Sequence, residues 1–183
     1  MYEEYIQRAW KTIEEIQKSG KALSIGASGY SAAYMEKTLK VASSPPVIND
    51  IFYHPYLDWS GDGYIDIEWL QKYIQVGSFK HLAPVLRKPE NRGPLQEPLA
   101  SIAERHGVSV PAVLIRWIIQ QGIAAIATTT NLDTLHAYIQ ALAMKKLEDD
   151  EMKKITDVGA SALDTLTTEW SKIFADDESW PKT

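Results

Sequence analysis

Four short apolar runs alternate with amphipathic helical patterns along most of this chain. The runs cover residues 22–27, 47–53, 75–79 and 124–127. Each run is short and bounded by turn residues, which is typical of a strand buried on both faces of a sheet. Strands that alternate with helices are joined by crossovers and form parallel β/α units. The sequence therefore predicts an α/β fold with four parallel strands.

Helical patterns fill the segments around these strands. Ile6, Trp10 and Ile13 recur at helical spacing and predict a helix over residues 3–18, and Ser31 is the expected N-cap of a second helix over residues 31–42. Further helices are predicted over residues 67–74, 99–106, 110–121, 132–145, 148–158 and 160–174. We expect a single domain over residues 1–183, with a leading helix in residues 1–20 and a C-terminal helix and tail in residues 160–183.

Composition and charge exclude several functional classes. A net charge of −5 argues against a nucleic acid or an anionic membrane as the main partner. The chain has no cysteine, which excludes a disulfide and a thiol nucleophile, and no histidine or carboxylate spacing indicates a metal site. The start of the chain lacks the pattern of a signal peptide, so we expect a cytoplasmic protein.

Four motifs carry a resemblance to a known family. The segment SIGASGY at residues 24–30 is similar to S-I-G-V-S-N-F, and NDIFYHPY at residues 49–56 is similar to N-Q-x-x-x-H-P-Y. AERHGVS at residues 103–109, followed by LIRW at residues 114–117, is similar to I-A-x-x-H-G-x-S with L-x-R-W. In this order the motifs resemble the C-terminal half of an aldo-keto reductase.

The resemblance implies that the four strands are the second half of a (β/α)8 barrel, a fold that usually needs about 250 residues. Four parallel strands leave two open sheet edges and an apolar inner face. We therefore expect a homodimer through the open edges, which would complete a pseudo-barrel. Coverage of the open face by the first helix is the alternative.

The resemblance also indicates a nicotinamide cofactor site that has partly changed. Ser28 corresponds to the family serine that contacts the nicotinamide carboxamide, and Phe79 corresponds to the aromatic residue that stacks on the ring. Remnants of the phosphate-binding loop follow the last strand at Thr128, Thr129 and Thr130.

Three substitutions weaken the predicted cofactor site. Gly29 replaces an asparagine and Asp50 replaces a glutamine, so two amide side chains are lost. Thr134 replaces the arginine that holds the 2′-phosphate. The catalytic tetrad of the family has no counterpart in the matched motifs. We therefore expect no cofactor, and NADPH only if the chain is a fragment of a reductase.

Ionisable residues at the strand ends suggest a different chemistry. Asp50, Lys80 and His81 are the predicted catalytic residues, because a carboxylate beside an ammonium or imidazole in a partly dry cavity can act as a general acid/base pair. Solvated strand ends, with Asp50 and Lys80 as a surface ion pair, are the alternative interpretation. The predicted substrate pocket is lined by Ser28, Tyr30, Tyr53, His54, Tyr56, Trp59 and Phe79. His54, in the His-Pro pair, is also expected to set the loop after its strand.

Three functional hypotheses follow. The favoured one is a cofactor-independent cyclase or isomerase that acts on an apolar small molecule of secondary metabolism, by analogy with relatives of this fold. The second is a non-catalytic binding or regulatory protein, and the third is the C-terminal fragment of an NADPH-dependent reductase. Gly29, Asp50 and Thr134 count against the fragment, because an intact reductase would keep its cofactor residues.

Overall fold

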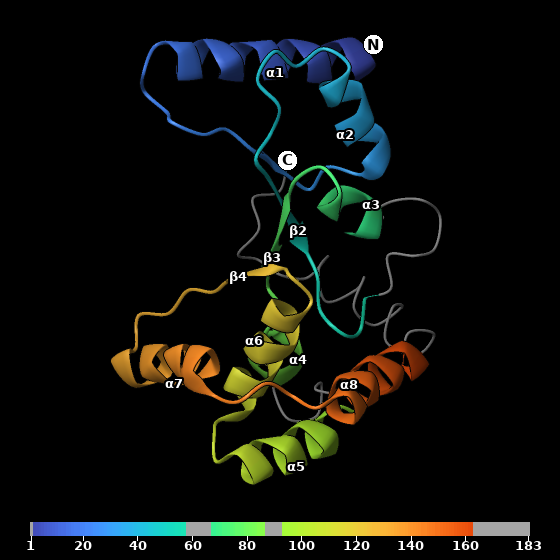
Figure 1. Cartoon of the computed structure of the whole chain (residues 1–183), viewed down its shortest axis with the longest axis vertical. Helices are drawn as coiled ribbons and strands as arrows, with labels where there is room; N and C mark the ends of the chain where they lie inside the picture. The colour runs from blue at the N-terminus through green and yellow to red at the C-terminus, as the bar shows by residue number, and fades with distance from the viewer. Residues whose placement is uncertain (1, 58–66, 87–92, 163–183) are drawn as a thin grey trace. The chain divides into compact units, whose positions relative to one another are not determined.

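The computed structural model describes residues 2–57, 67–86 and 93–162, which form two compact units (Figure 1). The first unit comprises described residues 2–53, 67–80 and 118–127. The second comprises described residues 54–57, 81–86, 93–117 and 128–162. Each unit is described below by itself, and the single domain expected over residues 1–183 stays a prediction. Most of the helix predicted over residues 160–174 lies outside the described residues.

The first unit contains a parallel sheet, as the alternating sequence pattern predicts. Its strands are β1 (Ala27–Ser28), β2 (Ile48–Phe52), β3 (Gln75–Phe79) and β4 (Ala124–Ile126). They lie side by side in chain order, and each adjacent pair is parallel. This consecutive order is the one that a β/α barrel requires.

The two faces of this sheet differ in their burial. Asn49, Ile51, Val76 and Ser78 project from one face and are fully buried. Residues on the other face alternate with them along each strand, because successive side chains point to opposite sides. Asp50, Phe52 and Phe79 on that second face are only partly buried, and Ile126 is exposed.

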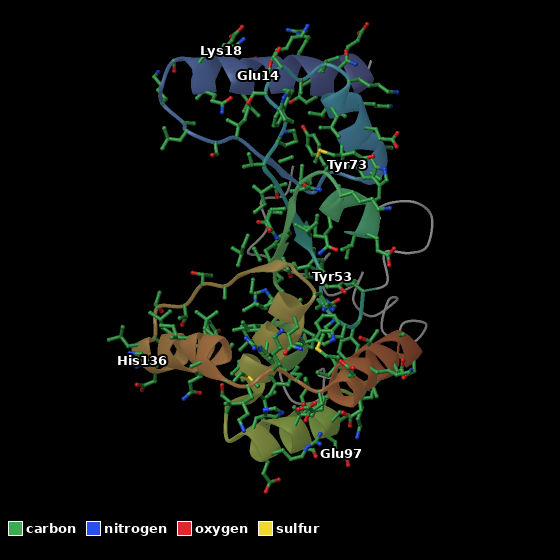
Figure 2. The ribbon with its side chains drawn as sticks, viewed as in Figure 1. Glu14, Lys18, Tyr53, Tyr73, Glu97 and His136 are labelled. Atoms are coloured by element: carbon green, nitrogen blue, oxygen red, sulfur yellow. The ribbon has the colours of Figure 1, made fainter. Side chains whose placement is uncertain are left out.

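Three complete helices belong to the described part of the first unit. They are α1 (Tyr2–Lys18), α2 (Ala32–Leu39) and α3 (Ile67–Gln71). The Glu14 carboxylate on α1 accepts hydrogen bonds from the backbone N–H groups of Ser43 and Ser44 at 2.6 and 2.7 Å, and Lys18 lies on the same helix (Figure 2). The Ser44 hydrogen bond is the main cause that lowers the pKa of Glu14. This carboxylate therefore ties α1 to the segment that leads into β2.

The second unit is helical. Its elements are α4 (Ala83–Leu86), α5 (Gln96–His106), most of α6 (Val110–Gln120), α7 (Leu132–Ala143) and α8 (Asp149–Ser161). Glu151 on α8 is buried and pairs with Arg105 and His106 of α5, at 2.9 Å in each case. Glu148 and Glu151 also form a capping box at the start of α8. One carboxylate therefore both caps α8 and joins it to α5.

Several predicted boundaries differ from the structure. The first strand was expected over residues 22–27, but only Ala27 and Ser28 pair as β1, and Leu23 is 95% exposed. The apolar run there was therefore misread as a buried strand. The helix expected over residues 67–74 ends at Gln71, and α4 was not predicted because four residues give too little periodicity. Ser31 is the N-cap of α2, as expected, and accepts a hydrogen bond from the N–H of Tyr34.

A close approach in the second unit gives a test of this packing. A Cβ atom at Gly159 of α8 would overlap the carbonyl oxygen of Pro55. We expect Gly159→Ala to lower the free energy of unfolding by about 1–3 kcal/mol, because the added methyl group overpacks a backbone contact. In an uncrowded helix the same change would stabilise by up to about 1 kcal/mol.

Urea unfolding monitored by circular dichroism measures this effect, with Ala160→Ser on the exposed side of α8 as the control. A stabilised Gly159→Ala variant would contradict the close contact with Pro55.

Candidate functional site

The partly buried side of the sheet carries most of the residues that the sequence singles out. Paired residues in a parallel sheet project to the same side. Ser28 pairs with Asp50, Asp50 with Gly77, and Gly77 with Ala124. In the same way Phe52 pairs with Phe79, which pairs with Ile126. We call this surface the Asp50 face; it consists of Ser28, Ile48, Asp50, Phe52, Gly77, Phe79, Ala124 and Ile126.

Hydrogen bonds hold the loop after β1 against β2. The carbonyl oxygen of Asp50 accepts from the N–H of Gly29 at 2.9 Å and from the hydroxyl of Ser28 at 3.2 Å. The Asn49 side chain accepts from the N–H of Tyr30 at 3.2 Å and donates to the Tyr30 carbonyl at 2.7 Å. Gly29 has a φ of 70°, which the turn requires and which glycine adopts without strain. Ser28 and Asp50 are therefore held side by side.

The Asp50 carboxyl group lies over Gly77 in apolar surroundings. Its Oδ1 atom is 3.0 Å from the position that a Cβ at Gly77 would take, and methyl groups of Ile48 and Ile126 approach the same position to 3.2 and 2.9 Å. Oδ1 is buried and has no hydrogen-bond partner among the described residues. Burial therefore raises the pKa of Asp50 above its ordinary value. The residue as a whole stays partly exposed, so the group remains within reach of a ligand.

An aromatic pair lies beside this carboxyl group on the Asp50 face. The rings of Phe52 and Phe79 stack with centroids 5.7 Å apart and an interplanar angle of 27°. Sequence reasoning named Phe79 but missed Phe52. The signal was available, because a period of two along β2 places Phe52 on the same side as Asp50.

Two other predicted pocket residues have different surroundings. The Tyr53 hydroxyl donates to the Gln121 side chain at 2.7 Å, and the Tyr53 carbonyl accepts from Ser78 (Figure 2). The Tyr30 ring meets Tyr34 edge-on at 6.3 Å, and burial is the main cause that raises the pKa of its hydroxyl. Trp59 lies outside the described residues. A pocket lined by these three residues stays a prediction.

The three predicted catalytic residues are not gathered in one unit. Asp50 and Lys80 belong to the first unit, and His81 is buried in the second. Burial alone accounts for the shifted pKa of Asp50, so no ammonium group offsets it, and the suggested ion pair with Lys80 is absent from the described structure. Lys80 has a φ of 54°, a left-handed conformation that lysine rarely adopts. The described surroundings of Asp50 favour its protonated form.

His54 and Tyr56 help to hold the second unit together. The His54 Nδ1 atom accepts from the N–H of Tyr56 at 3.1 Å, as expected for a residue that sets this loop. The Tyr56 hydroxyl accepts from the N–H of Leu95 at 2.8 Å. Burial raises the pKa of Tyr56 to about 12, although the Leu95 hydrogen bond opposes the shift. Both side chains are fully buried, so the structure gives them a packing role.

The threonines expected to contact phosphate lie at the start of the last segment of the second unit. The Thr129 hydroxyl accepts from the N–H of Asn131, and the Asn131 side chain accepts from the N–H of Thr134 at 2.9 Å. These bonds cap the N-terminus of α7, and Asn131 is its N-cap. Thr128 and Thr130 are exposed. The segment keeps a helix N-terminus but lacks the guanidinium group that a phosphate favours.

The described part of the chain contains neither a group of metal ligands nor a helix suited to span a membrane. Within residues 2–57, 67–86 and 93–162, no three histidine or carboxylate side chains are grouped as a metal site would require. None of the helices in these ranges combines the length and the apolar composition of a membrane span.

Parallel strands in consecutive order, with helices between them, are the arrangement found in β/α barrels, and a serine, a carboxyl group and stacked aromatic rings lie on one side of these strands. A family profile described as the aldo/keto reductase family matches residues 1–65 and 70–160. The chain belongs to this family.

Individual relatives agree with the family assignment. The chain is 27% identical over 172 residues to the NADPH-dependent alpha-keto amide reductase of Saccharomyces cerevisiae, covering 92% of this chain and 54% of that protein. It is 31% identical to the NAD(P)H-dependent D-xylose reductase of Kluyveromyces lactis, covering 88% of this chain and 50% of that protein. The chain therefore spans about half the length of the curated relatives it matches.

Solved structures give the same picture of the fold. The apo form of Gox0644 matches with a TM-score of 0.70 and 27% identity, over 84% of this chain and 53% of that chain. A Gox0644 variant in complex with NADPH matches with a TM-score of 0.68 and 27% identity, over 81% of this chain and 51% of that chain. The four parallel strands thus correspond to about half of a (β/α)8 barrel, as the sequence motifs predict.

The surroundings of Asp50 lead to a prediction about stability. Folding raises the pKa of Asp50 above its unfolded value, so the folded state retains the proton to higher pH. Between the unfolded-state and folded-state pKa values of Asp50, the free energy of unfolding falls as the pH rises. Above both values, the buried ionised carboxylate destabilises the folded state by a constant amount. We expect Asp50→Asn to raise the free energy of unfolding at pH 7, with the gain disappearing as the pH falls through the pKa of Asp50.

Urea unfolding at a series of pH values measures this difference, and Glu36→Gln on the exposed side of α2 is the control. An Asp50→Asn variant that is less stable than the wild type at pH 7 would show that the carboxylate has a favourable partner.

Proposed function

We propose that this chain is the cofactor-side half of an aldo-keto reductase barrel and binds the nicotinamide end of NADPH on the Asp50 face. The observation that carries this proposal is the placement of Ser28, Asp50 and Phe79 on one side of the sheet. By resemblance to the family, these positions contact the carboxamide and stack on the ring. Ser28 and Asp50 are neighbours in the register, and the Phe52–Phe79 pair supplies the aromatic surface beside them.

The raised pKa of Asp50 bears on the loss of the family glutamine at this position. An ionised carboxylate only accepts hydrogen bonds, so it cannot replace the glutamine of the family. A protonated carboxyl group has one donor and one acceptor, which is what an amide offers to the nicotinamide carboxamide. Burial of Oδ1 over Gly77 favours this protonated form. Asp50 is thus a pH-dependent substitute for glutamine, and the bound cofactor would supply the hydride chemistry of the family.

Self-sufficient reduction is not part of the proposal. Carbonyl reduction needs an acid beside the nicotinamide to protonate the developing alkoxide. The tetrad that supplies this acid in the family has no counterpart in the matched motifs. Thr134 stands where the resemblance expects the arginine for the 2′-phosphate. We therefore expect weak binding with little preference for NADPH over NADH, and no redox turnover by these residues without a proton donor for the alkoxide.

A cofactor-independent cyclase or isomerase is the second candidate function. A partly exposed carboxyl group with a raised pKa beside stacked aromatic rings is a suitable general acid or base for an apolar substrate. Lys80 and His81 are not needed in this version, because Asp50 alone would shuttle the proton. The two candidates differ in one respect: only the first requires a nicotinamide on the Asp50 face. For either function we propose a cytoplasmic protein.

Cofactor titrations at several pH values test the first candidate. We expect wild-type protein to bind NADPH more weakly as the pH rises, because Asp50 loses the proton that it donates. Asp50→Gln should bind more tightly than the wild type at pH 8 and should remove this part of the pH dependence. Isothermal titration calorimetry measures the dissociation constants of the wild type and of the variant. The ratio of these two constants at each pH cancels the contribution from titration of the cofactor phosphates.

Asp50→Ala is the control, since it removes both hydrogen bonds and should weaken binding at every pH. Equal affinities of the three proteins, or no binding to any of them, would rule out the nicotinamide site and leave the acid/base catalyst. Turnover of a substrate by the wild type without cofactor, lost in Asp50→Asn, would then support that second function.

The 2′-phosphate gives an independent prediction. We expect Thr134→Arg to raise the affinity for NADPH about tenfold, because one charge-assisted hydrogen bond contributes at least about 1.5 kcal/mol. The affinity for NADH, which lacks this phosphate, should not change. Parallel titrations with the two cofactors measure the difference, and an equal gain for both would indicate a general charge effect.

A further inference from the structure

The Asp50 face combines a carboxyl group with a pair of stacked aromatic rings, and all of its residues belong to the first unit. The buried Oδ1 atom of Asp50 has no hydrogen-bond partner among the described residues. The rings of Phe52 and Phe79 stack 5.7 Å apart on the same side of the sheet. An ionised carboxylate and the faces of aromatic rings both attract positive charge. The Asp50 face therefore suits a flat ring that carries a positive charge better than a neutral one.

The strands beside Asp50 bring no second titratable group to this face within the described residues. β2 pairs with β1 and β3, and β3 pairs with β4. The residues that these neighbouring strands contribute are Ser28, Gly77, Phe79, Ala124 and Ile126. In the loop after β1, burial is the main cause that raises the pKa of the Tyr30 hydroxyl, so this group stays neutral at pH 8. Lys80 follows β3, but burial alone raises the pKa of Asp50, so no described cation offsets the shift.

The register places Asp50 between the two residues that frame the proposed nicotinamide site. Asp50 pairs directly with Ser28 on one neighbouring strand, and Phe79 lies two residues beyond its other partner, Gly77. Standard strand spacings put the Cα atom of Asp50 about 5 Å from that of Ser28 and about 8 Å from that of Phe79. A ligand that contacts both Ser28 and Phe79 therefore passes close to the Asp50 carboxyl group.

The two oxidation states of the cofactor differ in charge at the nicotinamide ring. In NADP⁺ this ring is a pyridinium with one positive charge, whereas in NADPH it is an uncharged dihydropyridine. The phosphates, the sugars and the adenine are the same in both molecules. A glutamine, which the resemblance expects at position 50, carries no charge and gives little discrimination between the two rings. An ionised Asp50 attracts only the pyridinium.

We propose that the Asp50 face binds the oxidised, pyridinium form of nicotinamide in preference to the reduced form, and that the ionised Asp50 carboxylate distinguishes the two. This inference rests on the proposed function, since it requires the nicotinamide on the Asp50 face. Protonation of Asp50 removes the charge, so the preference weakens as the pH falls through the pKa of this group. The donated hydrogen bond and the charge therefore act at opposite ends of the pH range.

The expected size of the preference follows from the distances on the sheet. Opposite charges about 8 Å apart, at an effective dielectric constant of about 20, change an affinity by at least about tenfold. For a two-electron couple, tenfold tighter binding of the oxidised form lowers the midpoint potential of the bound cofactor by about 30 mV. The bound cofactor would then be harder to reduce than the free cofactor.

Isothermal titration calorimetry of the full 183-residue chain with NADP⁺ and with NADPH tests the inference. At pH 8 we expect the dissociation constant for NADPH, divided by that for NADP⁺, to be at least about tenfold larger in the wild type than in Asp50→Asn. Dividing the two constants cancels the phosphates, which both cofactors share. Comparing the two proteins cancels the attraction of the aromatic rings for the cation, which both proteins retain.

Glu36→Gln is the matched control, because it removes one negative charge from the exposed side of α2 in the same unit. This variant should keep the wild-type preference. In a series of titrations at decreasing pH, the preference of the wild type should fall towards that of Asp50→Asn, whose own preference should not change.

The possible failures can be told apart. If both cofactors bind and the wild type and Asp50→Asn show the same preference at pH 8, the inference is wrong, but the nicotinamide site stands. A preference that Glu36→Gln reduces as much as Asp50→Asn would also overturn it, in favour of a general effect of net charge. If neither cofactor binds to any of the three proteins, both this inference and the proposed nicotinamide site are wrong.

Discussion

The parallel register between β2 and β3 is the constraint on which the candidate site depends. Because Asp50 pairs with Gly77 and Phe52 pairs with Phe79, a carboxyl group and two aromatic rings project to the same side of the sheet. The missing side chain at Gly77 provides the space over which the carboxyl group lies. A shift of one residue in this register would turn Asp50 towards the face that buries Ile51 and Val76. The positions of the side chains on the Asp50 face therefore depend on the pairing of β2 with β3.

Three carboxyl groups show how the surroundings decide what such a group does. Glu14 accepts two backbone N–H groups, which lower its pKa and keep it ionised, and Glu151 pairs with Arg105 and His106 between two helices. Both carboxylates join separate segments of the chain: Glu14 joins α1 to residues 43–44, and Glu151 joins α8 to α5. Asp50 has apolar neighbours and a buried oxygen without a partner, so burial raises its pKa. The same type of group therefore acts as a structural contact at Glu14 and Glu151 but has surroundings that favour the protonated form at Asp50.

Family membership agrees with the strand order of the first unit. In a (β/α)8 barrel the strands lie side by side in chain order, and a helix follows each strand. The four parallel strands of this chain have the same consecutive order, and the chain spans about half the length of the curated relatives it matches.

Periodicity and local motifs are properties of neighbouring residues, so the amino-acid sequence alone predicts the class of fold, the four parallel strands, most of the helices and the family. It also predicts Ser28, Asp50 and Phe79 as site residues, and the structure places them on one side of the sheet. It overestimated the first strand, since an apolar run does not reveal that Leu23 points to solvent. It also grouped Asp50 with Lys80 and His81, which fall in two units, and missed Phe52. Burial, register and electrostatic surroundings involve residues far apart in the chain, so the raised pKa of Asp50 follows from the tertiary structure and not from the local sequence.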